Sequence, residues 1–107
     1  MAIFDTLRSE LKRGCVTIAV LSQLSGEQYG YALSKALADS GLPVEENTLY
    51  PLLRRLESQG LLTSIWREKD NRNTRYYRLS PEGKLILKRL LVEWKTINTS
   101  LERMLIP

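Results

Sequence analysis

Basic, amide and hydroxyl side chains gather in two neighbouring segments of this chain, where their chemistry suits phosphate groups and base edges. The first segment, Asn47 to Glu57, has the apolar spacing of a helix. The second consists of two strand-like runs, 61–69 and 75–79, joined by the polar turn 70–74. A helix fits the major groove of a duplex, and a basic hairpin tip can reach the neighbouring backbone. This order of elements therefore indicates a unit that grips DNA.

The positive charge of the chain is concentrated in one stretch. The formal net charge is only +4, with an isoelectric point of about 9.4. Between Trp66 and Arg89, however, eight basic residues stand against three acidic ones, so this stretch carries +5 and the rest about −1. An excess confined to the hairpin and the following helix suits a polyanion better than general solubility does. A solvated basic face with no partner is the alternative.

The third predicted helix offers four candidate contacts with DNA. Asn47 and Arg54 would lie on its outward side, and Arg54 could fork onto guanine or grip the backbone. Thr48 could contact a phosphate or a thymine methyl group, and Tyr50 a phosphate or a base edge. Three of the four have a structural alternative: Thr48 could cap the helix, Tyr50 could pack on the second helix, and Arg54 could pair with Glu57 three residues on.

The hairpin tip and the second helix complete the set of candidate DNA contacts. The tip residues surround a polar turn, which suits minor-groove or backbone contact, with ordinary solvation as the alternative. On the second helix, Lys35 is a candidate phosphate anchor. The tip candidates are Lys69, Arg72, Asn73 and Arg75.

The apolar spacing as a whole predicts a mainly α-helical fold with a two-stranded β-hairpin, in a single domain over residues 1–107. The hydrophobic content of 43% supports a modest core. Ser80 and Pro81 form a good helix start, with the serine as cap and the proline at the first position. Pro51 removes a backbone donor and should loosen the third helix without breaking it. The predicted helices cover about 5–24, 29–40, 46–57 and 81–105.

The first and last predicted helices each carry an apolar stripe that a small domain core cannot cover. On the first helix the stripe begins with Phe4, Leu7 and Leu11, and on the last it continues through Trp94 and Ile97. The two ends could pack against each other within one subunit or across two. We favour a homodimer built on the last helix, because a protein that reads two-fold-related half-sites works as a dimer.

Several kinds of chemistry are missing from the sequence. There is no histidine, and the one cysteine, Cys15, lies in an apolar helical run. Ordinary nucleophile–base pairs and transition-metal sites cannot be assembled from this set. We therefore expect neither an enzyme nor a metal or other cofactor, and a thiol- or metal-responsive regulator is disfavoured.

The same residues bear on where the protein resides. A lone cysteine cannot form an internal disulfide, so a reducing compartment is the default. Asp5 and Glu10 interrupt the first residues, which do not have the apolar core of a signal peptide. No apolar stretch approaches the roughly 20 residues that a spanning helix needs. The sequence thus predicts a cytoplasmic protein without a membrane partner.

Several motifs together resemble the PadR-like transcriptional regulators, in the short subclass that lacks a separate C-terminal domain. A tyrosine pair around a glycine opens the second helix, and a threonine-leucine-tyrosine run with a following arginine-leucine-glutamate marks the third. The match covers nearly the whole chain. Its pieces are Tyr29-Gly30-Tyr31, Thr48-Leu49-Tyr50-Pro51, Arg55-Leu56-Glu57, Gly60-Leu61-Leu62 and the stretch from Arg75 to Gly83.

The resemblance implies a winged helix-turn-helix domain that dimerises through its first and last helices. It also implies a repressor of a nearby operon, often one for drug export or stress, that a ligand releases. In a lactococcal multidrug-binding member of this subclass, paired tryptophans of the last helix enclose flat aromatic drugs, and Trp94 falls at the matching place. Its expected neighbours in a ligand site are Phe4, Leu7, Leu11 and Ile97, although an indole on such a stripe is usually plain core. Glu45 and Glu46 depart from the expected pattern, since they add repulsion near phosphates.

A rival function keeps the fold but removes the DNA. A helical protein–protein adaptor could use a winged-helix scaffold without binding a duplex at all. Binding to double-stranded DNA from the protein's own upstream region separates the two functions.

Overall fold

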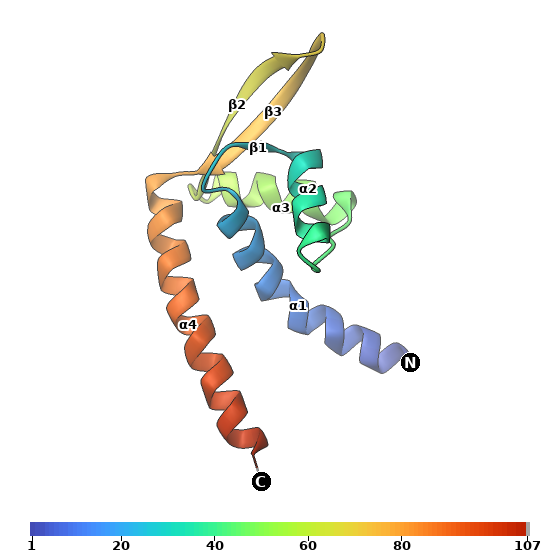
Figure 1. The fold of residues 1–107 in the computed structure, drawn as a ribbon, viewed down its shortest axis with the longest axis vertical. Coiled ribbons are helices and arrows are strands. Elements are labelled where there is room, and N and C mark those ends of the chain that lie inside the picture. The colour runs from blue at the N-terminus through green and yellow to red at the C-terminus, as the bar shows by residue number, and fades with distance from the viewer. Residues whose placement is uncertain (107) are drawn as a thin grey trace.

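Four α-helices and three β-strands make up residues 1–106 of the computed structural model, while Pro107 and the side chain of Lys69 lie outside the described part. The short helices and the C-terminal half of the first helix meet at the base of the hairpin, which projects away from them (Figure 1). The last helix runs in the opposite direction. The elements are α1 (Ala2–Gln23), β1 (Gln28–Tyr29), α2 (Gly30–Asp39), α3 (Glu46–Ser58), β2 (Leu62–Lys69), β3 (Arg72–Leu79) and α4 (Pro81–Leu105).

The start of α4 has the predicted cap. Ser80 lies just before the helix, and its Oγ accepts a hydrogen bond of 2.9 Å from the backbone N–H of Gly83. The same hydroxyl donates to the carbonyl of Gly60, at 2.6 Å. Gly83 itself is needed here, because a Cβ at this position would lie 2.0 Å from the carbonyl oxygen of Leu61. The first turn of α4 is therefore fixed directly onto the segment that leads into the hairpin.

Helix α3 is continuous through Pro51, so the predicted unbroken helix is confirmed. It ends at Ser58, and Gly60 follows with a φ of +82°, in the left-handed region that favours glycine. Its inward side is apolar as predicted. The buried side chains are Leu49, Leu52, Leu53 and Leu56.

The hairpin is longer and its turn tighter than predicted. Strands β2 and β3 pair antiparallel from Leu62 opposite Leu79 out to Lys69 opposite Arg72. Only Asp70 and Asn71 are left in the turn, with φ values of 53° and 62°. Two successive positive φ values are typical of the type I′ turn that closes two-residue hairpins, and aspartate and asparagine tolerate that conformation. The predicted five-residue turn 70–74 is wrong, since residues 72–74 belong to β3.

A third strand joins the hairpin. Strand β1 pairs antiparallel with β3, with Gln28 opposite Tyr77 and Tyr29 opposite Tyr76, and gives the order β1-β3-β2. The predicted two-stranded sheet therefore has three strands in the described residues. A strand of two residues is too short to show an alternating pattern in sequence, so only the folded chain reveals it.

The hydrophobic core lies between the C-terminal half of α1, α2, α3 and the base of the hairpin. Leucines dominate it, and Tyr77 adds the one buried aromatic ring among the described residues. The core consists of Val20, Leu21, Leu24, Leu33, Leu37, Leu49, Leu52, Leu53, Leu56, Leu62, Tyr77 and Leu79. None of the helices in residues 1–106 is both long and apolar enough to cross a membrane.

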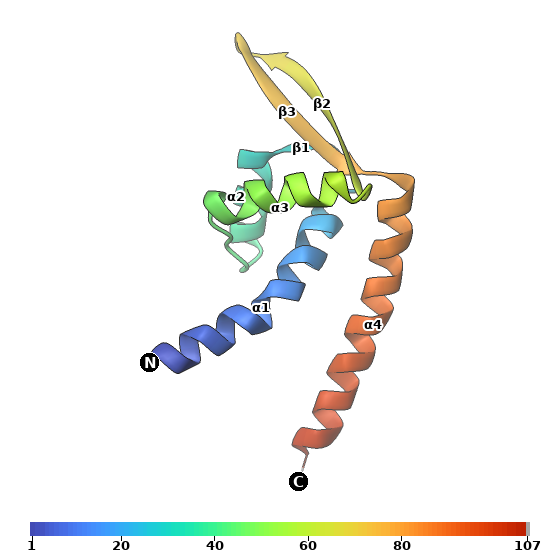
Figure 2. The ribbon, with the colours of Figure 1, turned by 180° about the vertical axis from the view of Figure 1, so that it is seen from behind.

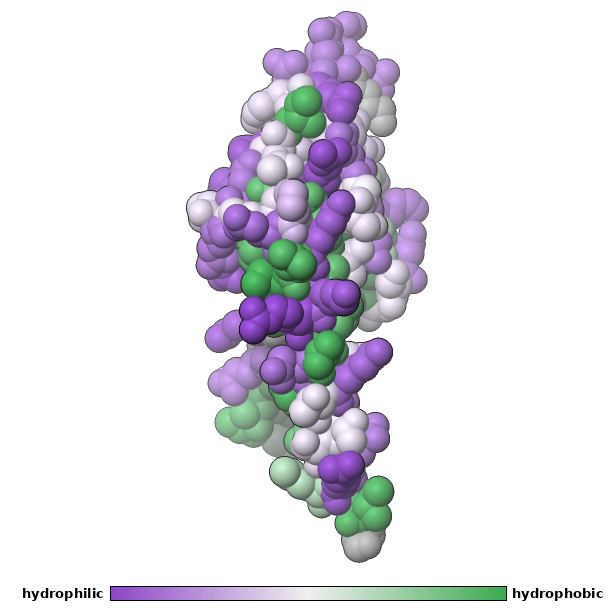
Figure 3. Space-filling view, turned by 90° about the vertical axis from the view of Figure 1, so that its left-hand side faces the viewer, coloured by the Kyte–Doolittle hydropathy of each residue, from purple (hydrophilic) through white to green (hydrophobic). Residues whose placement is uncertain are grey.

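The outer ends of α1 and α4 do not cover each other. The two helices diverge away from the core, so that their free ends lie well apart (Figures 1 and 2). Hydrophobic patches therefore interrupt the polar surface on the side of the molecule where α4 runs (Figure 3). Leu11 is 73% exposed on α1, and Ile97 is 57% exposed on α4. Of the two arrangements that the sequence left open, packing of these ends within one subunit is absent from the described chain.

Candidate nucleic-acid interface

The outward side of α3 presents polar side chains next to the hairpin. Asn47 and Arg54 are both exposed and stand seven residues apart, which places them on the same side of the helix, opposite the buried leucines. Helix α3 begins without a side-chain cap, so Thr48 does not have the capping role considered as an alternative. Thr48 is exposed instead. Asn47 and Thr48 are accessible near the amino end of α3, the part of a recognition helix that enters a groove in helix-turn-helix proteins, and Arg54 lies further along the helix.

Tyr50 packs against the start of α2. A Cβ added at Gly30 would lie 2.1 Å from Cε1 of the Tyr50 ring, so only glycine leaves room for this contact. Burial raises the pKa of the Tyr50 phenol, and Glu46 and Tyr77 raise it further. The side chain is half-buried and neutral, which fits the structural alternative, and a DNA contact through Tyr50 stays a prediction. From sequence, Gly30 marked only a helix boundary, and its packing role was missed.

Arg75 turns back toward α3. Its Nη2 donates to Oε1 of Glu57, and its Nε donates to Ser64 Oγ at 3.0 Å. The Ser64 hydroxyl in turn donates to Oε2 of the same carboxylate. The pairing of Glu57 with Arg54 that the sequence left open is replaced by this pairing with Arg75. The guanidinium expected at the wing tip is therefore engaged at the base of the wing.

The remaining tip residues divide between the two faces of the hairpin. Because strand side chains alternate, Asn73 shares a face with Arg75 and lies on the side of α3, while Arg72 shares the other face with Arg78. Arg72 and Asn73 are both exposed. Lys69 pairs with Arg72 in the strand register, and its side chain lies outside the described part. Within the described residues, no ion pair engages Arg72.

Lys35 is exposed on α2 and lies 3.8 Å from Asp39, one helical turn away. Exposed pairs of this kind contribute little to stability, because both charges are well solvated. The ammonium group can therefore leave Asp39 for a phosphate at small cost, and its role as an anchor stays a prediction.

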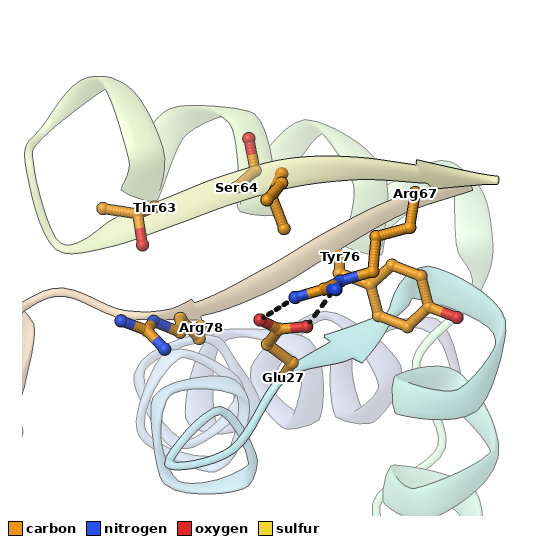
Figure 4. A pocket seen from close by; sticks show the side chains of 7 residues that line it. Glu27, Thr63, Ser64, Arg67, Tyr76 and Arg78 are labelled. Carbon is orange, nitrogen blue, oxygen red and sulfur yellow. Dashed lines mark hydrogen bonds and ion pairs between the residues drawn. The ribbon is translucent and has the colours of Figure 1, made fainter. Parts of the chain in front are cut away.

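A second ion pair, which the sequence did not reveal, lies on the face of the hairpin away from α3. Arg67 donates from Nε and Nη2 to the two carboxylate oxygens of Glu27, at 3.1 and 2.9 Å. This pair raises the pKa of Arg67, whose guanidinium also lies 5.9 Å from the centre of the Tyr76 ring. Figure 4 shows it beside a pocket of about 340 Å³ that Thr63 and Arg78 also line. Glu27 is 40 residues from its partner, a separation that no local pattern reports.

Helix α1 adds basic residues beside α3. Lys12 and Arg13 of α1 and Arg55 of α3 line a groove of about 670 Å³, together with Thr48. Apolar spacing placed α1 in the core and gave no reason to consider its polar side. Among the described residues, no group of three or more acidic, cysteine or histidine side chains could hold a metal ion.

The predicted ligand residues do not form one site within a single chain. Trp94 is 42% exposed on α4, and Ile97 lies beside it one turn on. Phe4, Leu7 and Leu11 are exposed on the outer half of α1, which diverges from α4 (Figure 2). A pocket that uses both sets therefore requires a second copy of the chain, and this ligand site stays a prediction.

Comparison with known proteins places this geometry in a family. Residues 18–89 match the model of the transcriptional regulator PadR-like family. A transcriptional regulator of Mycobacterium tuberculosis is 39% identical over 79 residues, which are 73% of this chain and 74% of that protein.

Solved structures agree with this match. A PadR family transcriptional regulator from Eggerthella lenta superposes with a TM-score of 0.91 at 45% identity, over 97% of this chain and 93% of that one. A Bacillus subtilis PadR in complex with operator DNA shares the fold, with a TM-score of 0.68 at 23% identity over 73% of this chain and 46% of that one. The mainly helical winged fold is thus confirmed, with its sheet corrected to three strands. The chain belongs to the PadR-like family of transcriptional regulators.

Proposed function

We propose that this chain is a dimeric, DNA-binding repressor of a nearby operon, such as one for drug export or stress response, and that a small apolar or aromatic ligand releases it. One observation carries the DNA-binding part. The exposed side of α3, with Asn47 and Arg54, stands beside a projecting hairpin (Figure 2), and Arg72 is exposed next to the turn of this hairpin. A helix and a wing in this relation can occupy a major groove and the adjacent backbone together.

The roles of the side chains follow from their positions. Asn47 and Arg54 would contact base edges, because they lie on the outward side of α3. Arg72 would contact the backbone from the wing tip and contribute a salt-dependent grip. A Bacillus subtilis PadR with this fold is solved in complex with operator DNA, which supports operator DNA as the partner.

Dimerisation would cover the apolar stripes that a single chain leaves open. A helix face of this kind buries its side chains against another helix in a stable assembly. Leu101 and Met104 extend the α4 stripe beyond Trp94 and are exposed in the single chain. Two copies would then present two reading heads to an operator with two-fold symmetry.

The ligand part of the proposal concerns the dimer interface. A flat aromatic molecule beside Trp94 would change how two α4 helices pack, and so the spacing of the reading heads. Such compounds can be titrated into a Trp66→Phe protein, in which Trp94 is the one tryptophan left. A compound that both quenches the fluorescence of Trp94 and weakens operator binding supports the site. If the same compound weakens operator binding equally in a Trp94→Ala protein, Trp94 does not belong to the ligand site.

DNA binding is tested by anisotropy with labelled duplexes from the protein's own upstream region. We expect one segment to bind much more tightly than the rest, with affinity falling as salt rises. Failure to bind any of these duplexes at low ionic strength would contradict the proposal. That result would favour the alternative function, a protein–protein adaptor with the same winged-helix fold.

A further inference from the structure

Helix α3 and the wing can grip one duplex together only if the angle between them is fixed. The hairpin is anchored at its base, where Leu62, Tyr77 and Leu79 are buried in the core. Its outer half projects well beyond the helices (Figure 1). A small rotation at the base would therefore move the tip by a large distance, so whatever fixes the base determines where the tip meets DNA.

A closed set of hydrogen bonds lies at this base and joins three elements. Arg75 comes from β3, Ser64 from β2 and Glu57 from α3. The guanidinium donates to both the hydroxyl and the carboxylate, and the hydroxyl donates to the second carboxylate oxygen. Among the described side chains, every hydrogen bond between the hairpin and α3 involves this one carboxylate. The set therefore connects both strands of the wing to the reading helix.

The surroundings of these hydrogen bonds hold the Arg75 guanidinium in place and limit its access to water. The Arg75 and Glu57 side chains are only 33% and 26% exposed, so their charge is shielded from water. The guanidinium also lies 5.6 Å from the centre of the Trp66 ring and 5.3 Å from that of Tyr77. A planar guanidinium that donates to two partners and contacts two rings is held in a defined orientation, which a flexible ammonium group could not reproduce.

We infer that Arg75 is a positioning residue that, through Glu57 and Ser64, holds the wing at a fixed angle to α3, and that it does not contact DNA. The inference rests on the proposed function, because a fixed angle matters only to a protein that reads a duplex. It differs from the expectation drawn from sequence, in which Arg75 contacted the minor groove or the DNA backbone from the tip.

The chain offers a matched control for the test. Glu57→Gln and Glu27→Gln each remove one negative charge, and each leaves one arginine of the hairpin without its carboxylate partner. Only Glu57 belongs to α3. Coulomb attraction alone predicts that both variants bind every duplex slightly more tightly. We expect Glu57→Gln instead to lose about tenfold in affinity for the duplex selected as tightest from a random pool, the scale of one mismatched base pair. Its affinity for a scrambled duplex should not fall.

The ratio of selected to scrambled affinity is therefore the deciding measurement. It should drop about tenfold in Glu57→Gln and stay within about twofold in Glu27→Gln, whose arginine partner is half exposed. Melting temperature and circular dichroism confirm that each variant is folded. If Glu57→Gln is poorly folded, Arg75→Lys replaces it, since lysine keeps the charge but cannot bond both partners in the fixed fork.

Two further readouts separate positioning from DNA contact. Arg75→Ala should lower the affinity ratio while the slope of log affinity against log salt stays as in the wild type, because no phosphate contact is lost. In a Trp94→Phe background, Glu57→Gln should change the emission of Trp66, since the cation beside its ring is released.

Equal affinity ratios in the two glutamine variants would overturn the inference, as would a salt slope reduced by about one in Arg75→Ala. A wild-type protein that binds no duplex would instead contradict the proposed function itself. The two failures are thus distinguishable in the same experiment.

Discussion

Individual side chains of the wing have different roles that their residue types alone do not reveal. Arg72 and Arg75 are three residues apart on β3, both arginines, and both were expected at a basic tip. The strand register puts them on opposite faces. Arg75 is held by Glu57 and Ser64, whereas Arg72 is exposed beside the turn. Of the two, Arg72 is the arginine available to a phosphate.

Replacing Arg72 with alanine should therefore weaken binding to all duplexes by a similar factor. The loss of one phosphate contact should reduce the salt slope by about one, because one fewer counterion is released. Arg103→Ala removes the same charge at the far end of α4 and is the matched control. An Arg72→Ala slope equal to that of Arg103→Ala would show that the wing tip does not reach the backbone.

Gly30 is a second residue whose role depends on a distant partner. Gly30→Ala places a methyl group against the Tyr50 ring, which must then move in a packed environment. We expect a loss of about 1–3 kcal/mol in the free energy of unfolding, measured by urea denaturation. Gly26→Ala is the control, since nothing lies within 4 Å of the added Cβ there. A loss of similar size in both variants would mean that backbone effects, rather than the ring, set the cost.

At the scale of elements, the sequence predicted what local chemistry determines. Helix ends are marked by residues close by: the predicted cap Ser80 before α4 is confirmed, and α3 ends within one residue of its predicted bound, just before Gly60. The position of β1 and the arginine partners of Glu57 and Glu27 depend on segments 18 to 49 residues away, because these contacts form only when the chain packs. The outward side of α3 was predictable from the same apolar spacing that predicted the helix itself. The hydrogen bonds between α3 and the wing were not predictable from local spacing.

The turn of the hairpin has two residues, Asp70 and Asn71, where the sequence predicted five. Asn71 has a φ of 62°, which a β-branched residue adopts only at a cost of about 1–2 kcal/mol. Asn71→Val should therefore open the outer part of β2 and β3, seen as faster amide hydrogen exchange there, with the core amides unaffected. Asn73→Val makes the same replacement inside β3 and should leave exchange unchanged. Equal exchange in the two variants would argue against the two-residue turn.

The whole molecule is elongated, with principal extents of 59 × 34 × 23 Å, because the wing and α4 project in opposite directions from the core. This shape separates two surfaces. The basic wing lies at one end, and the apolar stripe of α4 leads to the other. A second copy that covers the stripe would leave both wings free, so dimerisation and DNA binding would not compete for surface.

Leu101→Glu tests this arrangement, because it places a charge on the apolar stripe of α4, where Leu101 is exposed in the single chain. A buried carboxylate without a partner is costly, so we expect light scattering to show a shift from dimer to monomer. Operator affinity should fall with it, since one reading head then binds one half-site. Thr99→Glu adds the same charge on the opposite side of α4 and should remain dimeric. A Leu101→Glu protein that stays dimeric and binds the operator as the wild type does would show that two copies meet through another surface. The proposed ligand site at Trp94 would then lack the side chains that a second copy supplies.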